Sequence, residues 1–204
     1  NHIVVNKIIG ISGVGRSGKD SFYVYLKNLI SREFGVECRR IALADALKLD
    51  LDSFLWSSLG ISAFTDDNQE KDLIRDIMVA YGKVRRKMTD GRYWTDLIQP
   101  MVDNCIFHNI VPIITDIRYN VFPEDELFWL KKKNNGILFH VERIIDIHGS
   151  LVQPANSDEL ANDSSLRLSA DFSFTWPTLF NDPKSIQRWS DACIRKGVLR
   201  ILDA

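Results

Sequence analysis

The residues most able to do chemistry lie near the start of the chain, which reads Gly13-Val-Gly-Arg-Ser-Gly-Lys19. In a GxxxxGK pattern the glycines let the backbone turn its N–H groups around phosphate oxygens, and the lysine reaches the outer phosphates. An apolar run precedes it and a helical pattern follows, so the positive end of a helix would face the same anion. A glycine-rich turn without a ligand is the alternative. The residues expected to bind a nucleoside triphosphate are Gly13, Val14, Gly15, Arg16, Ser17, Gly18, Lys19, Asp20 and Ser21.

The residue after the lysine departs from the usual pattern. A Ser or Thr is expected there to coordinate Mg²⁺, whereas this chain has Asp20 followed by Ser21. A carboxylate can bind Mg²⁺ directly or through water, and Ser21 can supply the hydroxyl. The alternative is that Asp20 is an acid in the first turn of a helix, stabilised by the helix dipole.

A second group of polar residues follows the apolar run Ile110–Thr115. Asp116 is expected to order Mg²⁺ and its waters or to orient an acceptor phosphate, unless it only caps the following turn. Arg118 lies two residues on, so in an extended segment the two share a face. Its guanidinium can take a phosphate in bidentate fashion, and a structural ion pair with Asp116 is the alternative.

The remaining candidates are cations and aromatic residues in the middle of the chain. Lys48 and Arg75 are candidates for the acceptor phosphate, although Arg75 is equally readable as a solvated surface residue. Trp94 is expected to stack on an acceptor base or to lie in the core. Arg143, after the run ILFHV, is expected to neutralise charge between donor and acceptor. His140, inside that run, is interpreted as a core histidine rather than an acid or base.

The periodicity of the chain predicts strands alternating with helices. The predicted strands are 7–12, 40–44, 110–115, 137–141 and 171–175, with Pro112 an objection to a central place for the third. The predicted helices are 20–34, 45–58, 70–88, 92–107, 123–133 and 183–196, with a polar loop at 62–69. This alternation predicts an α/β, three-layer P-loop NTPase fold with a mainly parallel five-stranded sheet flanked by helices.

Length and composition favour a single domain over residues 1–204, with a helical acceptor-binding part at about 45–108 and a lid or irregular segment at about 144–170. The net charge of -1 argues against a nucleic-acid partner, and no apolar run is long enough for a membrane span. Three cysteines without CxxC spacing are typical of reduced core thiols in a cytoplasmic protein. The first residues show no secretory signal and no initiator Met, which leaves open a targeting segment ahead of them.

Five patches of the chain together resemble the deoxynucleoside monophosphate kinases of tailed bacteriophages. They are SGVGRSGKDS at 12–21, IALADALK at 41–48, RDIMVAYG at 75–82 with GRYW at 91–94, IITDIR at 113–118 and HVER at 140–143. The resemblance implies a nucleoside-monophosphate-kinase type fold and the transfer of a phosphoryl group from ATP, with Mg²⁺. The His-x-Ser/Thr-Glu element of that family reads Asn156-Ser-Asp-Glu159 here, so only a contribution of Glu159 is carried over.

The sequence therefore predicts a kinase that moves the γ-phosphoryl group of ATP to a (deoxy)nucleoside 5′-monophosphate. The partners expected are the two nucleotides, with ATP and Mg²⁺ as co-substrate and cofactor and no nucleic acid or membrane. A homodimer and a monomer stay open. The alternatives are a P-loop kinase of another small phosphorylated metabolite and a nucleotide-binding module that no longer transfers phosphate.

Overall fold

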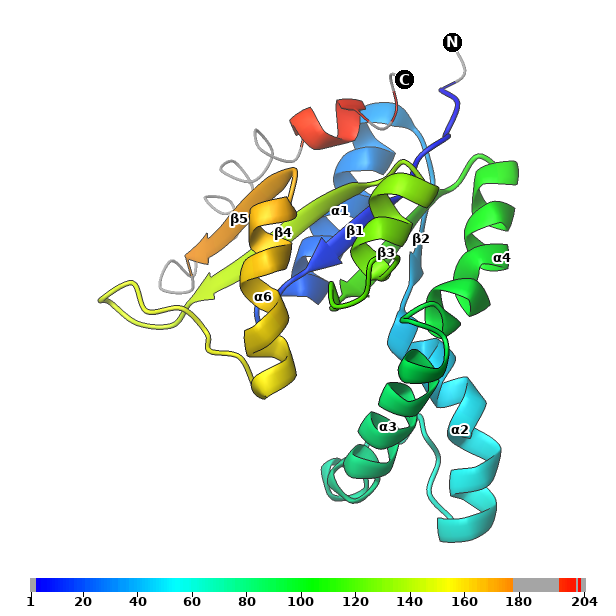
Figure 1. Ribbon diagram of the computed structural model, residues 1–204. Coiled ribbons are helices and arrows are strands. Elements are labelled where there is room, and N and C mark those ends of the chain that lie inside the picture. The colour runs from blue at the N-terminus through cyan, green and yellow to red at the C-terminus, as the bar shows by residue number, and fades with distance from the viewer. Residues whose placement is uncertain (1–2, 178–194, 201, 203–204) are drawn as a thin grey trace.

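The fold is built on one five-stranded parallel sheet. The computed structural model describes residues 3–177, 195–200 and 202. The strands are β1 (Ile9–Ser12), β2 (Cys38–Ile41), β3 (Val111–Ile117), β4 (Ile137–Ile144) and β5 (Phe172–Pro177), in the order β2-β3-β1-β4-β5 (Figure 1). β1 is central because β2 and β3 lie on one side of it, and the chain then crosses to the other side to form β4 and β5. In such sheets ligands bind at the carboxyl end of the strands where the direction reverses.

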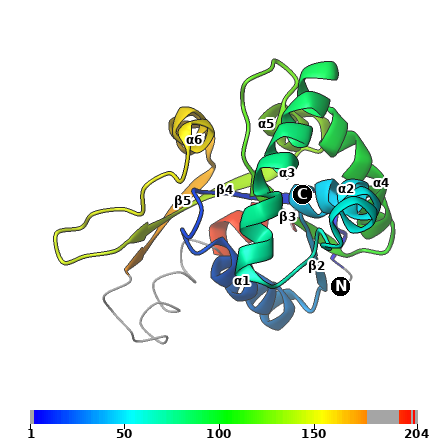
Figure 2. The same cartoon turned by 90° about the horizontal axis from the view of Figure 1, so that it is seen from below.

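Helices cover both faces of the sheet, as apolar strands without a polar alternation require. Helix α1 (Lys19–Phe34) packs through Phe22, Leu26 and Ile30 against one face. Helices α4 (Tyr93–Phe107) and α6 (Ser157–Ser169) lie on the other, together with the short α5 (Glu126–Phe128) and its continuation η1 (Trp129–Lys133), as Figure 2 shows from the end of the sheet. The predicted α/β class with three layers is confirmed.

Two helices project away from the sheet. Helices α2 (Leu43–Leu59) and α3 (Asn68–Met88) extend beyond the carboxyl ends of the strands (Figure 1). They hold one another through a small core of their own, formed by Leu51, Leu55, Ala63 and Ile74. Hydrogen bonds from the hydroxyl of Ser62 and the backbone of Ala63 to Asp52 tie the connecting loop to α2. This pair of helices forms the far wall of the site.

The segment predicted at about 144–170 as a lid or an irregular stretch is not irregular in its second half, where the chain forms α6, and a role as a lid stays a prediction. The helix begins because the side chain of Asn156 accepts the backbone N–H of Glu159 at 2.9 Å, an N-cap that completes the first turn. Only Asn162 and Leu166 are buried in it, so its sequence carries little apolar periodicity.

Other boundaries also differ from the predicted ones. The second strand ends at Ile41 rather than 44, because Leu43 already starts α2. The helix predicted at 123–133 starts at Glu126 and continues as a π-helical turn from Trp129. Pro112 does lie in an inner strand, but one residue before the first pair that β3 makes with β1, Ile9 with Ile113, so its missing N–H interrupts no bond there.

The predicted C-terminal helix at 183–196 lies mostly outside the described residues, of which 195–200 are helical and pack Val198 on the α1 side of the sheet. Cys38 and Cys105 are buried free thiols, as predicted, and Cys193 lies outside the described part. No helix in the described part of the chain is long and apolar enough to cross a membrane.

Candidate functional site

The predicted phosphate loop joins β1 to α1 in a conformation that requires glycine at two positions. Gly13 has φ 151°, and a Cβ atom there would lie 2.5 Å from the carbonyl oxygen of Val141. Gly18 has φ 93°, and a Cβ there would lie 2.7 Å from the indole nitrogen of Trp176. Arg16 also has a positive φ, 63°, a region that non-glycine residues seldom adopt. These dihedrals turn the backbone sharply between β1 and α1, and the binding of an anion by its N–H groups stays a prediction.

Lys19 is folded back onto this loop. Its Nζ donates to the carbonyl oxygen of Gly13 at 2.6 Å and lies 3.4 Å from that of Val14. Burial lowers the pKa of Lys19, and the nearby Arg118 guanidinium lowers it further, while Glu159 and Asp116 raise it. Backbone carbonyl oxygens therefore hold the ammonium group of Lys19 at the loop. A phosphate oxygen can replace them as its acceptor.

Asp20 and Ser21 lie exposed in the first turn of α1. Neither side chain makes a hydrogen bond or ion pair with another residue in the part of the chain that the structure describes. Their oxygens face solvent beside the loop, which fits a hard cation with oxygen ligands. Asp20 also occupies the helix end where the dipole favours an acid, so both predictions for this residue fit its position.

Asp116 lies within β3, and its carboxylate holds the start of α2. One oxygen accepts the backbone N–H of Leu43 at 2.7 Å and the other that of Ala44 at 2.8 Å. The capping alternative is therefore the one seen, although the capped helix is α2 rather than the turn that follows Asp116. The same side chain lines the pocket described below, so a role toward a ligand stays a prediction.

Arg118 follows β3 and does not form the alternative ion pair with Asp116. Its backbone N–H donates to Glu126 at 2.8 Å, its side chain makes no ion pair among the described residues, and the residue lines both the pocket below and a small crevice beside Gly13. Arg143 lies on the same side of β4 as Val141, opposite Trp176 of β5, and does not line that pocket. The charge-neutralising role of Arg143 stays a prediction.

A cavity of about 420 Å³ lies between α2, α3 and the end of β3. Lys48, Arg75, Trp94, Asp116 and Arg118, all predicted site residues, line it. Further charged residues in its wall are Lys71, Lys83, Arg86 and Glu126. The wall thus carries six basic and two acidic side chains, which suits an anionic ligand.

Three of the predicted site residues in this pocket differ in exposure: Lys48 is half-buried, Arg75 is exposed and Trp94 is buried. The Lys48 ammonium lies 5.8 Å from the ring centre of Phe64. Arg75 is paired with Asp72 at 2.8 Å on the exposed surface of α3, so it lies at the rim. Trp94 is buried, with its ring edge-on to Tyr93 at 4.6 Å between centroids, so it belongs to the core and the pocket wall at once.

A buried ion cluster, which the sequence did not indicate, supports the pocket from behind. Arg86 of α3 pairs with Asp125 at 2.7 Å and with Glu126 at 3.1 Å, and all three are almost fully buried. Glu126 also accepts the backbone N–H of Arg118 and, at 3.2 Å, that of Tyr119. Burial raises the pKa of Glu126 to about 8, against the Arg86 guanidinium, which favours the ionised form. No local sequence pattern predicts this cluster, because Arg86 is about 40 residues away from the two adjacent carboxylates.

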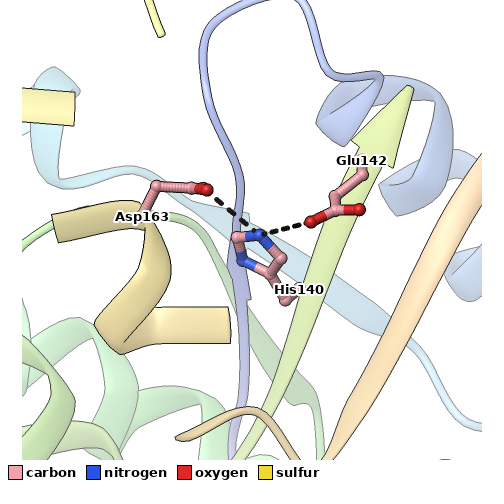
Figure 3. A group of neighbouring side chains, drawn as sticks. All are labelled: His140, Glu142 and Asp163. Atoms are coloured by element: carbon pink, nitrogen blue, oxygen red, sulfur yellow. Dashed lines mark ion pairs between the residues drawn. The ribbon is translucent and has the colours of Figure 1, made fainter. Parts of the chain in front are cut away.

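A second polar cluster lies beneath the loop, on the α6 side of β4 (Figure 3). His140 is buried; its Nδ1 lies 2.7 Å from the hydroxyl of Ser12, and its Nε2 lies 3.2 Å from Asp163 and 3.7 Å from Glu142. The three side chains are near enough to share a metal ion. However, the Arg167 guanidinium pairs with both carboxylates, at 2.6 Å and 2.7 Å. The buried ring fits the predicted core histidine, with its Nδ1 bonded to Ser12, whereas its Nε2 makes no hydrogen bond among the described residues.

The sequence indicated a contribution from Glu159 but not where its side chain lies. From the first turn of α6 its carboxylate reaches the phosphate loop, where both oxygens accept the backbone N–H of Gly15, at 2.9 Å and 3.2 Å. The next residue toward the N-terminus, Asp158, pairs with Lys83 in the pocket wall at 2.9 Å. One turn of α6 therefore touches both the loop and the pocket.

Two solved structures resemble the chain over nearly its whole length. A dephospho-CoA kinase from Campylobacter jejuni is 13% identical, with 96% of this chain and 97% of that chain covered and a TM-score of 0.49. The structure titled crystal structure of APE1195 is 10% identical, with 96% and 98% covered and a TM-score of 0.41. No family model and no curated protein matches the chain. Similarity this remote assigns no activity to the chain.

Proposed function

We propose that this protein is an ATP- and Mg²⁺-dependent kinase that transfers the γ-phosphoryl group to a (deoxy)nucleoside 5′-monophosphate. The observation that carries the proposal is the place of Arg118. Arg118 lines both the basic pocket and the crevice beside Gly13, and its charge adds to burial in lowering the pKa of Lys19. An arginine between an anion cradle and a second basic pocket suits transfer between two phosphorylated ligands.

The two sites divide the work in this proposal. The loop amides and Lys19 hold the donor phosphates, because backbone N–H groups and one ammonium match a polyphosphate. The basic wall, with Lys48 and Arg75, receives the acceptor phosphate, and the apolar side of the pocket, including Trp94, receives the acceptor base. Transfer then depends on positioning and charge neutralisation, with Arg118 between the two phosphates.

The three residues predicted to bind Mg²⁺, Asp20, Ser21 and Asp116, differ in how well they suit it as ligands. Asp20 and Ser21 expose oxygens that have no partner among the described residues and would lie next to the donor phosphates, so they are the better ligands, directly or through water. Both oxygens of Asp116 already accept backbone N–H groups, which leaves this carboxylate better suited to hydrogen-bonding ordered water. Bound there, the ion would neutralise charge on the donor phosphates.

The kinase proposal is tested by coupled ADP release from Mg·ATP across the deoxy- and ribonucleoside 5′-monophosphates, with other small phosphorylated acceptors in parallel. We expect one or a few nucleoside monophosphates to exceed the rest by at least about tenfold in kcat/KM, because a pocket with fixed polar groups rejects mismatched ligands. Turnover with only another phosphorylated acceptor would replace the substrate class. ATP binding without any transfer would identify a nucleotide-binding module instead.

A further inference from the structure

The phosphate loop already holds an anion that the chain itself supplies. The carboxylate of Glu159 is bound by the backbone N–H of Gly15 through both of its oxygens. Carboxylate and phosphate oxygens are interchangeable acceptors for such an N–H group. The negative charge of Glu159 also acts on Lys19, whose pKa it raises. Glu159 thus makes two of the interactions that a donor phosphate would make.

The first turn of α6 is held in this position by polar contacts. Asn156 caps it by accepting the Glu159 N–H, and Asp158 pairs with Lys83 across the edge of the pocket. The second half of the helix is anchored differently, with Leu166 in the apolar core and Arg167 on Glu142. The turn that carries Glu159 can therefore exchange its partners while the rest of α6 stays in place.

We infer that Glu159 is a competitor in cis for the phosphate loop, so that a donor nucleotide binds only after displacing its carboxylate from the Gly15 amide. This inference rests on the loop being the donor site of the proposed kinase. Its consequence is an apparent donor affinity lowered by the fraction of molecules in which Glu159 occupies the loop.

The competition is measured by calorimetric titration of inorganic pyrophosphate, without Mg²⁺, into the wild-type protein and E159A. We expect E159A to bind pyrophosphate about tenfold more tightly, because a hydrogen bond to a charged group is lost only from the free state. E124A is the control, since it removes a carboxylate on the surface that makes no contact with the loop, and it should leave pyrophosphate binding unchanged.

The NMR resonance of the Gly15 amide proton gives a second test that needs no bound ligand. This resonance should shift upfield in E159A and stay in place in E124A, because the hydrogen bond to a carboxylate is removed only in the first. E159A binding pyrophosphate no more tightly than E124A, or an unmoved Gly15 resonance, would overturn the competition. If neither the wild-type protein nor E159A bound pyrophosphate, the donor site itself, and the proposed function with it, would fail.

Discussion

The phosphate loop and the basic pocket face one another but are built in opposite ways. The loop takes its functional groups from nine consecutive residues, and most of them are backbone amides fixed by the dihedrals of Gly13 and Gly18. The pocket takes side chains from α2, α3, the start of α4, the end of β3 and α5. A backbone cradle tolerates changes in most side chains, whereas a pocket of side chains depends on the position of every helix that carries them.

The buried cluster of Arg86, Asp125 and Glu126 shows what that dependence means. It connects α3 to the segment after β3, and Glu126 at its centre also fixes the backbone of Arg118. The charged side chains that contact the loop, Lys19 and Glu159, are only half-buried, and Ser12 and His140 beneath it are joined by one hydrogen bond. Changes in the loop should therefore affect chemistry, and changes behind the pocket should affect stability first.

The sharpest test of the loop is Lys19→Ala. Phosphoryl transfer should fall by at least about 10²- to 10³-fold, because a preorganised charge at the transferred group is lost. The midpoint of urea unfolding should hardly change, since the Nζ of Lys19 bonds only to loop carbonyls. Steady-state ADP release and urea unfolding measure the two effects. Unchanged turnover would contradict the assignment of the loop.

Arg86→Met, behind the pocket, should lower the stability of the fold first, in contrast to Lys19→Ala. Asp125 and Glu126 would remain buried without a cation, which costs about 3–5 kcal/mol in the free energy of unfolding. Arg92→Met is the matched control, because Arg92 pairs with Glu124 on the surface at 3.7 Å, an interaction of about 0–1 kcal/mol. Equal losses in the two variants, by urea titration, would show that the cluster does not support the pocket.

Arg118→Ala tests the boundary between the two regions. We expect KM for the monophosphate to rise about 10- to 100-fold, as loss of a charged hydrogen-bonding partner implies, and KM for ATP to change less than about threefold. Arg75→Ala should have a smaller effect, because Arg75 lies exposed at the rim and is paired with Asp72. If both KM values were unchanged in Arg118→Ala, its acceptor role would be withdrawn.

A smaller effect of pH is expected from His140, beneath the loop. Burial lowers the pKa of His140, so the unfolded chain takes up this proton at a higher pH than the folded protein does. The stability that the neutral ring confers should be present above about pH 6.5 and be lost as the pH falls below it, by at most about 1.4 kcal/mol per pH unit.

The comparison is made between the wild-type protein, His140→Gln and His108→Gln, by urea unfolding from pH 7.5 to pH 5.5. His108 is the control because its ring is exposed at the end of α4. The slope should flatten only in His140→Gln. The same slope in all three proteins would exclude His140 as the group that titrates.

Much of the fold and the whole loop followed from the sequence, because their signals are local. Apolar runs of strand length and helical spacing placed all five strands and most helices, and the GxxxxGK spacing placed Gly13 and Lys19 at the carboxyl end of β1. The pattern also selected Lys48, Arg75, Trp94, Asp116 and Arg118, which share one pocket. It assigned Asp116 less well, since its partners in α2 lie over 70 residues away.

Only the tertiary structure decided how the two regions are joined. The sequence showed Arg86 and Glu126 as two charges among many, without any sign that they meet in the core. It singled out Glu159 only through the family resemblance, without any sign that this side chain reaches the loop. Such contacts depend on where helices dock on the sheet, which distant apolar side chains determine together. The chain's local pattern thus determined the anion cradle, and the packing of α3, α5 and α6 decided what faces it.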